Sequence, residues 1–124
     1  MPDAGGSLPN VELKEEPIPD YSEELQEIRE LFDLFFTRCK EHGVEHIVGS
    51  SGETPQSLAA KLVQHFPVLE PQYQNSVQSH QSKYDAVVLD LIVMLRNEAE
   101  IAVKKGDLQG AQSYGQPVYS ILYE

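Results

Sequence analysis

Apolar residues recur every three or four positions along most of the chain, and this spacing is the period of an α-helix. In residues 22–42, Ser22 suits the capping position and Gly43 suits a stop, so the sequence predicts a first helix there. The apolar seam of this helix consists of Leu25, Ile28, Phe32, Phe35 and Cys39. A second helix is predicted to begin after the cap Thr54, with a proline at its first position, and to end before Pro67.

The longest helical pattern runs from Pro71 to Lys105 without an internal glycine or proline. Within it, residues 86–95 are apolar nearly all round, which is typical of a helix at the centre of a bundle or of one covered by a partner. β-Branched residues are dense in the same stretch, so a buried strand is the alternative. We predict one long helix because no turn signal flanks the apolar stretch.

Two shorter segments complete the pattern. Residues 46–48, with the sequence His-Ile-Val, could form a short extended segment, although three residues cannot build a sheet alone. After Gly106 and a capping Asp107, a last helix is predicted. Two glycines weaken that helix, and it is expected to be interrupted before Pro117.

These patterns predict an all-α fold, a small antiparallel bundle of about four helices in residues 21–124. Residues 1–20 contain four prolines and scattered acids, so they cannot bury enough apolar area to order, and we expect a disordered arm. A chain of 124 residues holds one small domain at most. Its apolar end is either buried or continues into further sequence, in which case the chain is the N-terminal part of a longer protein.

The formal net charge is −11, and the acidity is concentrated near the N-terminus, where residues 1–30 hold nine acids against two bases. A field of this sign repels phosphate backbones and anionic head groups, so we expect neither nucleic acid nor membrane as a partner. Cys39 is the only cysteine, which excludes an internal disulfide framework and fits a reducing compartment, either nuclear or cytoplasmic.

Few residues suggest chemistry. Cys39 and His42 could share an ion, with His46 nearby, but a structural zinc site needs four ligands and no second pair is close in the sequence. The apolar setting of Cys39 also opposes a reactive thiolate. The chain contains neither a nucleophile elbow nor a phosphate-binding loop. We therefore predict no catalytic residue, no metal and no cofactor.

Asp90 is unusual because it lies inside the most apolar segment, where a carboxylate needs solvent or a partner. We expect it to mark the solvent-facing edge of its helix. The alternatives are a buried pair with Arg96 and a role at an interface.

The leading hypothesis for function is a non-enzymatic protein–protein interaction module, an adaptor or scaffold in a regulatory nuclear assembly. The apolar surplus supports it, because helix 22–42, the central long helix and the end of the chain each offer more apolar surface than a small bundle hides. The expected partner is another protein or a second copy of the chain. The predicted partner-binding residues, with Phe36 foremost, are Phe32, Phe35, Phe36, Val118, Tyr119 and Leu122.

A second hypothesis, from another class, is a small helical enzyme or ligand carrier. Its pocket would lie inside the bundle and would be lined by His65, Tyr73, His80 and Tyr84. A concave cavity that holds all four side chains would favour it, whereas a grooved apolar surface would favour the interaction module.

Residues 95–114, LRNEAEIAVKKGDLQGAQSY, carry a lysine pair and then Gly106 and Asp107, with the small Ala99 before them and Ala111 and Tyr114 after them. This segment resembles one helix–turn–helix unit of a tetratricopeptide repeat. The likeness covers about one repeat, near residues 95–118. It departs from the pattern at Glu98, where an apolar residue is usual, and at Pro117. With no second copy in the chain, it implies an antiparallel helical hairpin rather than a solenoid.

Leu13-Lys14-Glu15-Glu16 resembles the acceptor consensus for a small ubiquitin-like modifier, which is an aliphatic residue, a lysine, any residue and a glutamate. Conjugation needs an extended and accessible backbone, which a proline-rich arm supplies. The alternative is a solubilising tail in which Lys14 has no special role. The resemblance implies that Lys14 is a modification site and that the protein spends time in the nucleus.

Overall fold

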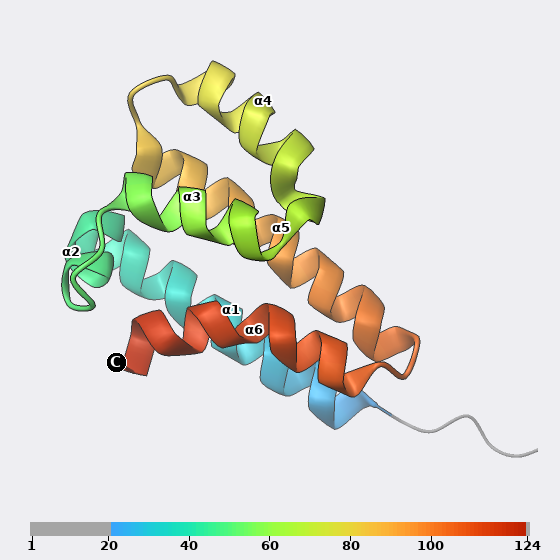
Figure 1. The fold of residues 1–124 in the computed structure, drawn as a ribbon. Coiled ribbons are helices and arrows are strands. Elements are labelled where there is room, and N and C mark those ends of the chain that lie inside the picture. The colour runs from blue at the N-terminus through green and yellow to red at the C-terminus, as the bar shows by residue number, and fades with distance from the viewer. Residues whose placement is uncertain (1–20, 124) are drawn as a thin grey trace, which may run out of the picture.

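The computed structural model describes residues 21–123 and confirms the all-α class (Figure 1). The predicted arm, residues 1–20, and Lys14 within it lie outside the described residues. Six α-helices occur in the described part rather than about four, together with one short 3₁₀ turn, η1. Their bounds are α1 Ser22–His42, α2 Val44–Gly49, α3 Pro55–His65, η1 Pro67–Leu69, α4 Glu70–His80, α5 Tyr84–Lys104 and α6 Leu108–Tyr123.

Helix α1 has the predicted bounds, and its apolar seam faces the core, where Ile28, Phe32 and Phe35 are buried. Tyr21, rather than Ser22, occupies the capping position, and no side-chain hydrogen bond caps the helix. Gly43 ends the helix with a φ of +85°, a conformation that glycine adopts without strain.

The segment expected to be extended, residues 46–48, is instead part of helix α2. Val44, Ile47 and Val48 lie on one face of this helix and are buried, so helical spacing hides three apolar residues that a strand would place on opposite faces. Helix α3 begins as predicted, because the Thr54 side chain accepts from the Ser57 amide at 3.1 Å and the Ser57 hydroxyl accepts from the Thr54 amide at 3.1 Å.

The prediction of one long helix over residues 71–105 is wrong, because α4 ends at His80 and α5 begins at Tyr84. Gln81 turns the chain with a φ of +52°, although no glycine or proline marks the place. The turn folds α4 back onto the side of α5, where α4 covers part of the apolar stretch (Figure 1). Tertiary packing therefore overrides the local helical preference here.

Helix α6 starts where predicted, with an Asp107 carboxylate oxygen accepting from the Gly110 amide at 2.9 Å. The expected interruption before Pro117 is wrong, because the helix continues through it to Tyr123. A proline inside a helix removes one N–H donor, and here the carbonyl left without its usual partner is that of Ser113. Helices α5 and α6 form an antiparallel hairpin (Figure 1).

Helix α5 is the centre of the described fold, and it contacts each of the other five α-helices. Its buried residues are Val87, Val88, Leu91, Ile92, Leu95, Ala99, Ala102 and Val103, so most of its circumference is covered, while a stripe that includes Val93, Asn97 and Ile101 faces solvent. Three of the predicted partner-binding residues, Phe32, Phe35 and Val118, have no exposed surface and belong to this core. They are therefore not available at the surface of the folded chain.

Candidate functional site

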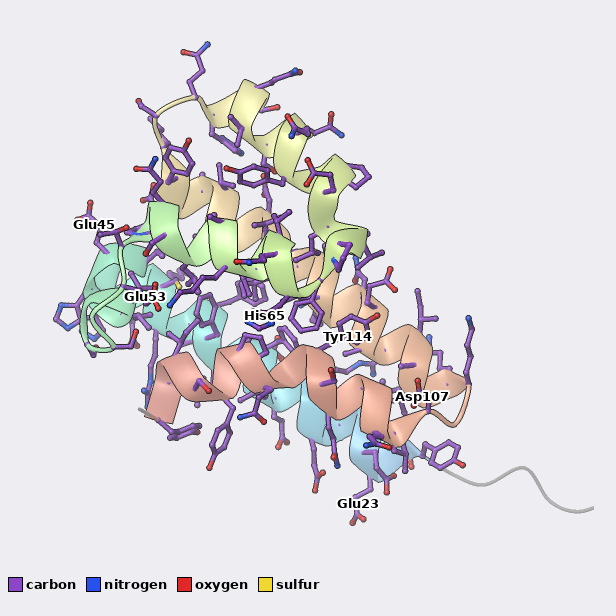
Figure 2. All side chains as sticks on the ribbon, viewed as in Figure 1. Glu23, Glu45, Glu53, His65, Asp107 and Tyr114 are labelled. Atoms are coloured by element: carbon purple, nitrogen blue, oxygen red, sulfur yellow. The ribbon has the colours of Figure 1, made fainter. Side chains whose placement is uncertain are left out.

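An open groove of about 800 Å³ lies between α3 and α6. It exists because α3 packs on α5, and α6 packs on α5 and α1, without the two helices packing along each other. Figure 2 shows the side chains of His65 and Tyr114 between them. The rings of Phe66 and Tyr114, with centroids 5.3 Å apart, join the end of α3 to the middle of α6. We call this hollow the α3–α6 groove.

The floor of the α3–α6 groove is apolar and includes Leu58, Leu62 and Ile121, which are buried. Its α3 side carries Lys61, which forms an ion pair with Glu53 from the preceding loop. The bond from Lys61, together with one from the Ser57 hydroxyl, holds the pKa of the Glu53 carboxyl below its ordinary value. The charges on this side therefore largely compensate each other.

The α6 side of the groove is lined by neutral polar side chains. These are Gln109, Gln112, Ser113, Gln116 and Ser120, with Pro117 among them. Each glutamine amide can both donate and accept hydrogen bonds, and each hydroxyl can do the same. A wall of this kind can bind both hydrogen-bond donors and hydrogen-bond acceptors, and it does not require a charge on the ligand.

Helix α6 contains no charged residue in its sixteen positions, although much of it faces solvent. Gln112, Gln116, Tyr119 and Tyr123 follow 4-3-4 spacing and are all exposed, and we call them the outer face of α6. The two tyrosines are 51% and 54% exposed, and their ring centroids are 4.8 Å apart. The outer face thus ends in a pair of neighbouring aromatic rings.

A shallower hollow of about 260 Å³ lies on the other side of α6, against α1. Ile28, Leu31 and Gly115 line it, with Tyr119 at its edge, and Gln112 and Gln116 line both hollows. A Cβ atom at Gly115 would lie 3.3 Å from the Leu31 Cδ2, so glycine permits α6 to approach α1 closely.

Two of the remaining predicted partner-binding residues lie on α6 and the third on α1. Tyr119 belongs to the outer face of α6, and Leu122, one turn further along the same helix, is half-buried. Phe36 is half-buried, with the Arg96 guanidinium 5.6 Å from its ring centroid. None of these three placements tests whether the residue contacts a partner.

A second cluster joins α4 to α5. The Ser76 hydroxyl donates to Asp90 Oδ2 at 2.8 Å, and His80 Nε2 lies 3.0 Å from the same oxygen. Asp90 is partly exposed, in agreement with the predicted solvent-facing edge, but its partners come from α4. The alternative of a buried pair between Asp90 and Arg96 is not what the structure shows, because Arg96 lies 3.9 Å from Asp33 on α1 instead.

Ser76, His80 and Asp90 are the residue types of a hydrolase triad, but their order differs. In a triad the imidazole lies between the hydroxyl and the carboxylate, so that it can take the hydroxyl proton. Here the carboxylate lies between the other two, and both are bonded to it. This geometry holds α4 against α5 and does not activate the Ser76 hydroxyl.

The four residues proposed for an enzyme or carrier pocket do not meet in one cavity. His65 lines the α3–α6 groove, whereas Tyr73 and His80 belong to the contact of α4 with Tyr84 and the rest of α5. Burial, chiefly, and the neighbouring Tyr84 raise the pKa of the Tyr73 phenol.

The candidate metal ligands Cys39, His42 and His46 differ in how far they are exposed to solvent. Burial raises the pKa of the Cys39 thiol to about 11, so it stays protonated at neutral pH. His42 and His46 are exposed, with ring centroids 5.1 Å apart. Within residues 21–123, no three His, Cys, Asp or Glu side chains gather as a metal-binding group.

Comparison with protein-family models, with curated proteins and with solved structures finds no match to this chain. Between residues 21 and 123, no helix is long and apolar enough to cross a membrane. The candidate site therefore rests on the geometry of α6 and its two flanking hollows.

The glutamines of α6 and the Ser76 cluster are absent from the sequence-based predictions. For α6 a signal was present, because residues 108–123 lack any charge in a chain that is 23% charged. For Ser76 there was none, since a serine in a polar helix does not reveal that it will be buried beside Asp90.

Proposed function

We propose that this protein is a non-enzymatic protein–protein interaction module, an adaptor or scaffold, whose partner binds along α6. The binding surface consists of the outer face of α6 and the hollows on both sides of it. Tyr119 is the residue that this surface shares with the set predicted from the sequence.

The observation that carries the proposal is the absence of charge on α6. At 23% charged composition, sixteen residues would carry about four charges, and an exposed helix usually carries more than the average. The centres of protein interfaces are depleted in charged residues and enriched in tyrosine, because burying a charge costs free energy unless it is paired. The solvent-facing side of α6, which carries no charge and ends in Tyr119 and Tyr123, fits such a surface.

The enzyme or carrier hypothesis loses its support in the geometry, since His65 lies apart from Tyr73, His80 and Tyr84. A bundle pocket would need these groups to converge on one ligand.

The experiment compares affinity capture from cell extracts by the full chain and by two variants. Gln112→Glu combined with Gln116→Glu places two charges on the outer face, whereas Gln64→Glu combined with Gln78→Glu places the same charges on exposed positions of α3 and α4 outside both hollows. The proposal expects the first variant to lose specific partners that the second retains, because a buried unpaired charge is costly. Identical partner sets for all three proteins would contradict it.

A regulatory role in the nucleus is part of the proposal through Lys14, which lies outside the described residues. With purified conjugating enzymes, Lys14→Arg and Glu16→Ala should each abolish attachment of the modifier, since one removes the acceptor amine and the other the consensus acid. Glu15→Ala is the matched control, because that position is free in the pattern. Equal modification of the wild type and Lys14→Arg would remove Lys14 from the proposal.

A further inference from the structure

We infer that the α3–α6 groove binds an extended peptide segment of the partner, about five residues long, with apolar side chains at alternate positions and no acidic residue. This inference rests on the proposed function and deepens it by naming the class of ligand. It concerns the α3–α6 groove alone and not the hollow beside α1.

The length of the groove suits a short extended chain. From Gln109 to Ser120 the groove follows α6 for about 17 Å, at the helical rise of 1.5 Å per residue. An extended chain rises about 3.3 Å per residue, so about five residues span that length. A helix pairs its own backbone groups, whereas an extended chain needs partners of the kind that the polar α6 wall supplies.

The α6 wall suits a peptide backbone. An extended segment leaves N–H and C=O groups unpaired along its edges, and these must find partners when they are buried. Gln112 and Gln116 are about 6 Å apart along the helix, close to the repeat of about 6.6 Å at which an extended chain presents its groups on one edge. Their amides can accept from the peptide N–H and donate to the peptide C=O.

Pro117 adds an acceptor to the same wall. Because proline has no N–H, the Ser113 carbonyl has no amide donor four residues ahead in the helix. Ser113 and Pro117 are one turn apart and both line the α3–α6 groove. A peptide N–H that enters the groove can satisfy this carbonyl.

The floor and the charges define the side chains of the ligand. Leu58, Leu62 and Ile121 form an apolar floor, and an extended chain points every second side chain to one face. Glu53 is already compensated by Lys61, so the groove offers no free cation for an acidic side chain. The net charge of −11 further disfavours an acidic peptide and favours basic flanks.

The test selects peptides from a library of random linear twelve-residue sequences displayed on phage, with the full chain as bait. We expect enrichment of sequences with apolar residues at alternate positions and without aspartate or glutamate. Synthetic copies of the enriched peptides are then titrated against the wild type and two variants. Gln109→Leu changes a residue that lines only the α3–α6 groove, and Tyr119→Ala changes one that lines only the hollow beside α1.

The inference expects Gln109→Leu to weaken binding about two- to tenfold, as the loss of one hydrogen bond does, and Tyr119→Ala to leave it nearly unchanged. N-methylation of alternate peptide amides should weaken binding to a similar extent, because it removes the donors that face α6. Peptides that depend on Tyr119 and not on Gln109 would overturn the inference and leave the proposed function standing. Enrichment of helical or acidic sequences, or of none, would also overturn it, whereas the proposed function is decided by the capture experiment with the Gln112 and Gln116 variant.

Discussion

Helices α4 and α6 both pack on α5, but they are held there by different forces. Helix α6 buries Ala111, Gly115, Val118 and Ile121, so its contact is apolar and closely packed. Helix α4 fully buries one residue, Ser76, and meets α5 through the hydrogen bonds of Ser76 and His80 to Asp90 and through the partly buried Tyr73 and Val77. One helix is part of the core, and the other is attached to it through polar bonds and a few half-buried side chains.

The difference predicts which part of the molecule opens first. Apolar contacts with α5 and α1 disappear only when the core itself opens, whereas a few hydrogen bonds exchange readily with water. Local unfolding occurs where buried apolar contacts are few. We therefore expect α4 to open on its own and α6 to open only with the whole fold, which leaves the proposed binding surface rigid.

The largest effect is expected for Leu91→Ala at the centre of α5. Leu91 has no exposed surface, so the substitution removes buried methyl groups and leaves a cavity, at a cost of about 2–5 kcal/mol in the free energy of unfolding. Urea denaturation measures it. Ile101→Ala on the same helix is the control, because Ile101 is 45% exposed and should change stability far less. An unchanged midpoint for Leu91→Ala would refute the central position of α5.

Asp90→Ala should have a smaller and more local effect. It removes the acceptor of the buried Ser76 hydroxyl, at a cost of about 1–3 kcal/mol. Hydrogen exchange should show faster exchange for the amides of α4, with those of α6 unchanged. Asn97→Ala, at an exposed position of α5, provides the comparison. An equal loss of protection in α6 would mean that the two helices open together.

The ion pair of Arg29 on α1 with Glu100 on α5 tests how exposure to solvent changes the contribution of a polar contact to stability. The hydrogen bonds from Arg29, at 3.2 Å, hold the pKa of the Glu100 carboxyl below its ordinary 4.5. A lowered pKa contributes stability that is present above pH 4.5 and is lost as the pH falls through the folded-state value. Glu100→Gln should therefore flatten the fall in stability on acidification.

For this exposed pair, the change in the free energy of unfolding should stay within about 1 kcal/mol. Thermal melts between pH 6 and pH 3 measure it, and Glu45→Gln, at an exposed position of α2, is the matched control. A steeper acid dependence in Glu100→Gln would show that the sign is wrong.

The smallest effect is expected for the alkylation rate of Cys39, which Asp90→Ala should leave unchanged. Because the pKa of the half-buried Cys39 thiol is about 11, alkylation of the folded protein at pH 8 should be slow. Leu91→Ala should speed it by raising the population of the unfolded chain, whereas detaching α4 should not. Faster alkylation of Cys39 in Asp90→Ala would show that the polar contact of α4 also supports α1.

Helix bounds that depend on local signals could be predicted from the sequence. The apolar seam and Gly43 predicted α1 with its correct bounds, and Thr54 and Asp107 marked the starts of α3 and α6. The break at Gln81 had no such signal, because it depends on the fit of α4 against α5, which is a contact between segments. Pro117 carried a signal that packing overrode.

The candidate site was harder to predict for the same reason. The two walls of the α3–α6 groove come from segments about fifty residues apart, and no pattern within either segment shows that they face each other. Apolar residues such as Phe32 and Phe35 suggested a partner surface, yet a core of this size has room for both rings. The informative feature was the absence of charge in α6, which only becomes meaningful once the helix is seen to be exposed.

The uncharged surface of α6 also separates how fast a partner arrives from how long it stays. The acidic residues lie elsewhere in the chain, so their field would guide a basic partner of the proposed kind toward the protein, and added salt screens that field. Contacts of that partner with α6 itself would involve no ion pairs and would be little affected by salt once formed. Raising ionic strength should therefore slow association while the lifetime of the complex stays nearly constant.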